Sequence, residues 1–138
     1  MSYSLKVADG DLVAQGNQLA LVFGVDKLNQ DISLWLLERY GGDRFHVSMG
    51  SILEDFVGAI STPSTRSEVQ AEVFRVLQNY QAVQLRRLKE APQLLSSSEL
   101  LVSVDDIATT VSYDTVSVMC RLRNGSDTST TIKVAQIV

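Results

Sequence analysis

Four carboxylates close together in the sequence are the best candidates for catalytic chemistry. Glu38, Asp43, Glu54 and Asp55 lie in or beside one predicted helix–loop–helix segment. Glycoside cleavage requires two carboxyl groups at a defined separation, one of which protonates the leaving group. Acidic residues in such places also cap helices and keep surfaces solvated, and only 7% of the chain is aromatic, which leaves few rings to stack on sugars. We therefore expect a solvated surface here and predict no catalytic residue.

The single histidine and the single cysteine offer little further chemistry. His46 lies near Ser48 and Ser51, but the chain has no G-x-S-x-G nucleophile elbow, and a serine triad is defined by geometry in space. Cys120 falls on the apolar face of a predicted strand, which is typical of a core cysteine. One cysteine and one histidine are too few for a Cys/His zinc site, so we expect neither a metal nor a cofactor.

The charges restrict the class of partner. Sixteen acidic residues against 12 basic ones give a formal net charge of −4, which repels phosphate backbones, so nucleic acid is not an expected partner. The single basic cluster is Arg86, Arg87 and Lys89, at the predicted end of a helix. These cations either oppose the helix dipole or dock an acidic protein. No stretch approaches the ~20 apolar residues of a membrane helix, and no signal peptide is recognised, so we expect a protein made in a cytoplasm and no membrane contact.

The first part of the chain must form strands that lead into helices. Alternation over Tyr3–Ala8 predicts a half-buried strand with Tyr3 and Leu5 on the inner face, and turn signals at Asp9-Gly10 and Gly16-Asn17 predict a small β-hairpin or meander. The period then changes at Asp26, the expected N-cap of a helix that stops before Gly41-Gly42.

Two further helices are expected before the chain returns to strands. The segment Ser51–Val57 predicts a short helix. Thr65-Arg66-Ser67-Glu68 has the form of a capping box, followed by one long apolar stripe, so a long amphipathic helix should end by Glu90, before Pro92.

The remaining segments, Leu100–Val104, Val116–Arg123 and Thr130–Val138, alternate as strands do. Strands, then helices, then strands indicate an α+β fold in a single domain over residues 1–138, with a long helix packed on a mixed or antiparallel C-terminal sheet. The last segment lacks the proline or clustered lysines that blunt sheet edges, since Lys133 is its only charge. It is either an interior strand or an edge that pairs with another chain.

Three stretches in the middle of the chain form one ordered pattern. They are Gln30-Asp31-Ile32-Ser33-Leu34-Trp35-Leu36-Leu37, Gly42-Asp43-Arg44-Phe45-His46 and Gly50-Ser51-Ile52-Leu53. This order, with an opening Leu5–Leu12 similar to an N-terminal hairpin, resembles the baseplate wedge and sheath-initiator family of contractile phage tails, often named lysozyme-like. The residues that carry the motif are Gln30, Asp31, Trp35, Gly42, Arg44, Gly50, Ser51 and Leu53. The family usually has Glu-Pro-Arg after the long helix, whereas this chain has Glu90-Ala91-Pro92-Gln93 and lacks the arginine.

The resemblance implies a structural role and no enzymatic activity. It implies a virion protein, assembled in the host cytoplasm, that sits in the inner baseplate in six copies around the tail axis. Its implied partners are the baseplate wedge proteins, the tail tube and the tail sheath protein, whose extended arms would pair with its sheet. The sheath-docking strand implied in this way is Thr130, Thr131, Ile132, Lys133, Val134, Ala135, Gln136, Ile137 and Val138. The alternative is a peptidoglycan-degrading, lysozyme-like tail enzyme.

Overall fold

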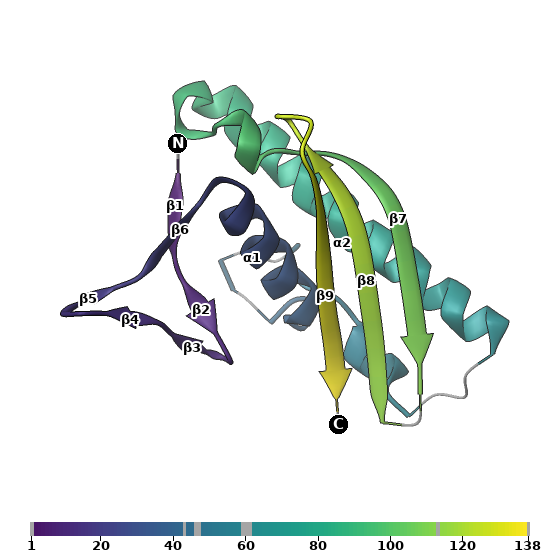
Figure 1. Cartoon of the computed structure of the whole chain (residues 1–138). Helices are drawn as coiled ribbons and strands as arrows, with labels where there is room; N and C mark the ends of the chain where they lie inside the picture. The colour runs from purple at the N-terminus through teal and green to yellow at the C-terminus, as the bar shows by residue number, and fades with distance from the viewer. Residues whose placement is uncertain (1, 43, 46–47, 59–61, 113, 138) are drawn as a thin grey trace.

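The computed structural model describes residues 2–42, 44–45, 48–58, 62–112 and 114–137 (Figure 1). The predictions that concern Asp43, His46 and Val138 lie outside these residues. The fold is α+β, as predicted: short N-terminal strands precede two helices and a three-stranded C-terminal sheet. Helix α1 packs on β9 and helix α2 packs on β7, so the two helices cover the same face of the sheet (Figure 1).

The N-terminal segment forms three short two-stranded ribbons instead of one hairpin. The strands are β1 (Tyr3–Leu5), β2 (Val7–Ala8), β3 (Asp11–Leu12), β4 (Ala14–Gln15), β5 (Gln18–Leu19) and β6 (Leu21–Phe23). The ribbons β1–β6, β2–β3 and β4–β5 spread as three arms from one junction (Figure 1). At that junction Lys6 N–H donates to Ala20 O (2.8 Å), Ala20 N–H to Val13 O (2.8 Å) and Val13 N–H to Lys6 O (3.1 Å). This closed ring of hydrogen bonds holds the three arms together.

The predicted inner face of the first strand is wrong. Tyr3 and Leu5 are 65% and 43% exposed, and they pair across the ribbon with Phe23 and Leu21 on the outer face. The residue turned inward is Val22, which is buried opposite Ser4. The register of β6 therefore decides which face of this ribbon meets the body of the protein.

Both long helices begin earlier than the sequence suggested. Helix α1 (Gly24–Leu37) places Asp26 in its first turn rather than at its N-cap. Helix α2 (Pro63–Glu90) has Thr62 as its N-cap, whose side chain accepts a hydrogen bond from Thr65 N–H, so the predicted capping box at Thr65–Glu68 is wrong. Pro63 explains the shift, because proline fits the first helical position, where no N–H is needed. The predicted end of α2 at Glu90 is confirmed.

Short 3-10 turns take the place of the other predicted helix and link α2 to the sheet. The predicted helix over Ser51–Val57 is a single 3-10 turn, η1 (Leu53–Phe56). Two more, η2 (Pro92–Leu94) and η3 (Ser97–Glu99), connect α2 to the first strand of the sheet.

The C-terminal sheet is antiparallel, in the order β7 (Leu101–Val111), β8 (Thr115–Asn124) and β9 (Ser129–Ile137). The predicted inner face of β8 is confirmed, because Val116, Val118, Cys120 and Leu122 are all buried. The alternation predicted for Leu100–Val104 is wrong, since Leu101 is buried and Val102 is 53% exposed. Two register shifts in this part of β7 break the regular alternation.

One core joins both helices to the sheet. Leu28, Ile32 and Leu36 of α1 have no exposed surface, and Trp35 is 8% exposed beside them. On α2 the core residues are Val69, Val73, Val76, Leu77 and Tyr80. Among the described residues, neither helix is long and apolar enough to cross a membrane.

Candidate functional site

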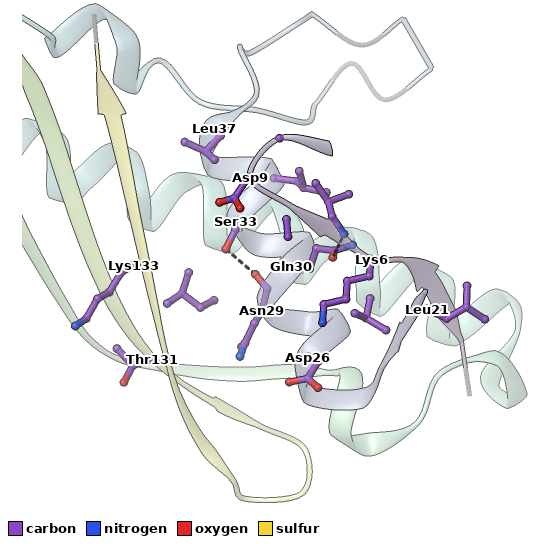
Figure 2. A pocket seen from close by; sticks show the side chains of 16 residues that line it. Lys6, Asp9, Leu21, Asp26, Asn29, Gln30, Ser33, Leu37, Thr131 and Lys133 are labelled. Atoms are coloured by element: carbon purple, nitrogen blue, oxygen red, sulfur yellow. Dashed lines mark hydrogen bonds between the residues drawn. The ribbon is translucent and has the colours of Figure 1, made fainter. Parts of the chain in front are cut away.

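The strand predicted to dock a partner lies at an edge of the sheet. In the described part of the chain, β9 pairs with β8 on one side and with no strand on the other. A cavity of about 660 Å³ lies along that other side. It is lined by Thr131–Lys133 of β9, by α1 residues between Asp26 and Leu37, by Lys6–Gly10 and by Leu21 and Val22 (Figure 2). We call this cavity the β9 groove.

The hydrogen-bond register shows which main-chain groups of β9 face the groove. Asn124 N–H donates to Thr128 O at 3.1 Å, which makes these opposed residues a hydrogen-bonded pair. The register continues without a shift along β9, and hydrogen-bonded and non-hydrogen-bonded pairs alternate in antiparallel ladders. Residues 130, 132, 134 and 136 therefore bond to β8. Residues 129, 131, 133, 135 and 137 point their N–H and C=O groups outward, and no other described segment bonds to these groups at Thr131 or Lys133.

The opposite edge of the sheet is partly covered by side chains of α2. Gln70 Nε2 donates to Ile107 O at 2.9 Å, and Gln81 Nε2 donates to Leu101 O and Val102 O at 3.2 and 3.1 Å. Gln84 adds a fourth bond at this edge, because its Oε1 accepts from Leu101 N–H at 2.8 Å. The register shifts in β7 further disturb this edge, and both devices are known protections of sheet edges. Thus side chains of α2 bond main-chain groups of Leu101, Val102 and Ile107 on the β7 edge, whereas no described segment bonds the outward groups of Thr131 and Lys133 on β9.

Two neighbouring amide side chains on α1 hold the two walls of the groove. Gln30 Oε1 accepts from Val7 N–H at 2.9 Å and its Nε2 donates to Leu5 O at 2.8 Å. Gln30 thereby bridges the break between β1 and β2 and fastens the β2–β3 arm to α1. On the other side Asn29 Nδ2 donates to Thr130 Oγ1 at 2.9 Å, and Thr130 Oγ1 lies 3.1 Å from Asn29 Oδ1. The role of Asn29 was not predicted, because a contact over this sequence distance leaves no local signal.

Of the motif residues, Asp31 and Trp35 belong to the interior near α2. The Asp31 carboxylate accepts from Lys27 Nζ at 2.7 Å and from Tyr80 OH at 3.3 Å. The Trp35 and Tyr80 rings meet edge to face, with centroids 5.3 Å apart. Burial, together with the nearby Asp31 carboxylate, raises the pKa of Tyr80 far above its usual value. These residues hold α1 against α2 and lie away from the β9 groove.

The remaining motif residues shape the loop after α1. Gly50 has a φ of +107°, and a Cβ there would lie 2.7 Å from the carbonyl carbon and oxygen of Arg39. Ser51 Oγ donates to Leu36 O at 2.5 Å, and Ser51 N–H donates to Glu38 O at 2.8 Å. Leu53 is buried, whereas Gly42 and Arg44 are exposed. The structure therefore does not gather the motif residues at one site.

The other candidate residues lie outside the groove. Arg86, Arg87 and Lys89 are exposed at the end of α2, where Arg87 borders a separate cavity of about 430 Å³. Glu54 forms an ion pair with Arg39 (2.7 Å).

The structure also bears on two other kinds of chemistry, a reactive thiol and a metal site. Burial raises the pKa of the Cys120 thiol to about 12. No three of the described His, Cys, Asp and Glu residues form a group that could hold a metal ion.

Comparison with known proteins gives a likeness of fold. No family model matches the chain, and no curated protein matches it. Among solved structures, a crystal structure from Geobacter sulfurreducens, of a protein provisionally named a tail lysozyme, matches with a TM-score of 0.57 and 10% sequence identity. The match covers 82% of this chain and 89% of that chain. At this identity the likeness shows that the two chains share a fold.

Proposed function

We propose that this chain is a structural protein of a contractile phage tail or a related injection machine. In this proposal it belongs to the inner baseplate, binds the wedge proteins and starts the first ring of tail sheath by accepting a strand at β9. Six copies around the tail axis would present six such strands as a ring.

The observation that carries the proposal is the difference between the two edges of the sheet. On the β7 edge Gln70, Gln81 and Gln84 bond main-chain groups, whereas no described segment bonds the outward N–H and C=O groups of Thr131 and Lys133, which lie beside a groove. Unpaired strand edges bind extended segments of other chains through main-chain hydrogen bonds. A strand left open in this way, in a sheet whose other edge is partly covered, supports docking at β9.

The sequence pattern and the fold support the tail assignment. The pattern from Gln30 to Leu53 resembles the sheath-initiator family, and the structural neighbour is named a tail protein. The basic cluster Arg86, Arg87 and Lys89 is our candidate surface for an acidic partner such as a wedge protein, because it is exposed and does not line the groove.

A proline at Lys133 tests strand docking. Proline removes one outward N–H and is tolerated at edge positions that do not bond to the neighbouring strand. Lys133→Ala is the matched control, because it removes the same side chain but keeps the N–H. In tails assembled with Lys133→Pro, we expect tubes on baseplates without sheath in electron micrographs, and sheathed tails with Lys133→Ala.

Normal sheath on baseplates that contain folded Lys133→Pro protein would contradict the proposal. Circular dichroism and a thermal melt establish whether the variant is folded, and Thr131→Pro is a second variant of the same design. Deleting Thr130–Val138 should also prevent sheath formation. That deletion removes Ile132 from the core, however, so it does not separate docking from folding.

Peptidoglycan hydrolysis is the second candidate function, because the structural neighbour carries the name tail lysozyme. Its best residues are Glu38, which borders a cavity of about 420 Å³ with Gly42 and Arg44, and Glu54. We expect purified protein to release no reducing ends from cell walls. Release that disappears in Glu38→Gln or Glu54→Gln, but persists in the control Glu90→Gln, would favour the enzyme over the structural protein.

A further inference from the structure

We infer that the occupant of the β9 groove is an extended peptide that continues the antiparallel order of the sheet, pairs with Thr131 and Lys133, turns alternate apolar side chains toward α1 and places a carboxylate opposite Lys133. The inference rests on the proposed function only in taking the ligand to be a strand. It adds which main-chain groups bind, which face is apolar and where the charge must lie.

The main-chain part follows from the register. Thr131 and Lys133 are the outward-bonding residues of β9 that line the groove, so an added strand first meets two N–H and two C=O groups. In an antiparallel pair, a residue directly opposite Lys133 and bonded to it also points its own N–H and C=O toward β9. The amides of its two neighbours point away. Binding should therefore depend on every second amide of the peptide.

The inner side of the groove selects apolar side chains. Leu34 and Leu37 of α1 line it and are 38% and 45% exposed. The rest of its apolar lining is Val7, Ala8, Leu21, Val22 and Ile132. Exposed leucines that lie beside an open strand edge gain from contact with a side chain that turns inward from an added strand. The uncharged polar α1 residues of the lining, Asn29, Gln30 and Ser33, already have hydrogen-bond partners. Inward positions of the peptide should thus be Val, Ile or Leu.

The position of Lys133, rather than the net charge of the groove lining, favours a carboxylate on the peptide. The lining contains Lys6 and Lys133 together with Asp9 and Asp26, which balance in number. Figure 2 shows Lys133 on β9, and Lys6, Asp9 and Asp26 on the facing side of the groove. Lys133 is exposed on the outer face of the sheet, where a directly opposed residue lies on the same face. An opposed Asp or Glu is stabilising there, and an opposed Lys or Arg is destabilising.

A synthetic nine-residue peptide provides the probe: acetyl-Thr-Val-Thr-Val-Glu-Val-Thr-Val-Thr-amide. Its valines turn inward when its central Glu lies opposite Lys133. Nuclear magnetic resonance of the full chain is used to follow amide exchange during titration. We expect the amides of Thr131 and Lys133 to exchange rapidly in the free protein and slowly at saturation. The amides of Ile132 and Val134, which bond to β8, should exchange slowly in both states.

Matched peptides separate the three parts of the inference. N-methylation of the central Glu should weaken binding roughly tenfold, because one main-chain bond is lost, whereas N-methylation of an adjacent Val should leave affinity unchanged. Replacing the Glu by Lys should weaken binding roughly two- to fivefold, and Lys133→Glu should reverse that preference.

Three results would overturn the inference. They are no binding at millimolar peptide, rapid exchange of the Thr131 and Lys133 amides at saturation, or an equal loss of affinity in both N-methylated peptides. Each differs from failure of the proposed function. If the peptide fails while Lys133→Pro still prevents sheath formation, docking at β9 stands and the ligand chemistry is wrong. If the peptide binds as expected while Lys133→Pro tails carry normal sheath, the strand site is real and the sheath assignment is wrong.

Discussion

Individual side chains position the β9 groove through contacts that span large distances in the sequence. Gln30 holds the β2–β3 arm on α1 by bonding Val7 N–H and Leu5 O, and Asn29 bonds the Thr130 hydroxyl. Each amide uses both its donor and its acceptor in this way, which fixes its orientation. The two adjacent residues thus set the width of the groove from the same turn of helix.

Gly50 gives a prediction at this scale, because its backbone approaches Arg39 closely. Gly50→Ala should lower the free energy of unfolding by about 1–3 kcal/mol, since φ is +107° and the new Cβ would overlap the Arg39 carbonyl. Gly41→Ala is the matched control, with a φ of +77° but no atom within 4 Å of its added Cβ. Urea denaturation of both variants is the measurement. An equal loss in both would mean that backbone strain alone, and not the contact with Arg39, makes glycine necessary.

At the scale of elements, α2 serves as the cover of the β7 edge as well as a support for the core. Its buried apolar residues belong to the core. Gln70 and Gln81 donate hydrogen bonds to carbonyl groups of β7, the first strand of the C-terminal sheet. Covering an edge with a helix removes a surface on which other strands would pair. Among the described residues, β9 carries no such cover, although α1 lines the groove beside it.

Gln81→Ala tests this cover. Loss of the two bonds to Leu101 O and Val102 O should destabilise the protein by about 1 kcal/mol and expose β7 to pairing with other copies. Gln78→Ala, on an exposed position of the same helix, should change neither property. Denaturation and sedimentation velocity measure the two effects. If Gln81→Ala stays as stable and as monodisperse as Gln78→Ala, the glutamine does not protect the edge.

The elements that could be predicted from the sequence are those whose pattern is local. The alternation from Val116 to Leu122 gave the inner face of β8, and Pro92 marked the end of α2 at Glu90. The strand at the C-terminus was recognised, although its place at the edge was left open. The register shifts in β7 and the inner face of β6 depend on partners elsewhere in the chain, so local alternation could not reveal them.

The same division applies to the groove. Thr131 and Lys133 were expected in a docking strand, and that role stays a proposal. The wall of the groove formed by the N-terminal arms could not be predicted. The hydrogen bonds among Lys6, Val13 and Ala20 that join the three arms use main-chain groups, which do not depend on residue type. Asn29 was missed for a related reason: a polar residue on a helix surface has many possible partners, and only the folded chain selects one.

At the scale of the whole molecule, the described chain has three parts with distinct tasks. The sheet supplies the open strand, the two helices support one of its faces, and the three-armed N-terminal unit stands beyond α1 as the second wall (Figure 1). Since the walls come from opposite ends of the chain, the groove exists only when the whole chain has folded. A partner that binds there would therefore recognise the finished protein and not a folding intermediate.

The glutamines bonded to β7 restrict how copies of this chain can associate through that edge. A molecule with two open sheet edges can assemble into a fibre, whereas a molecule with one open edge can form only a dimer through that edge. Two copies that met through their β9 strands would form a twofold pair with nothing left to recruit a third. The partial cover of β7 thus reduces the edge-to-edge stacking that unprotected sheets permit.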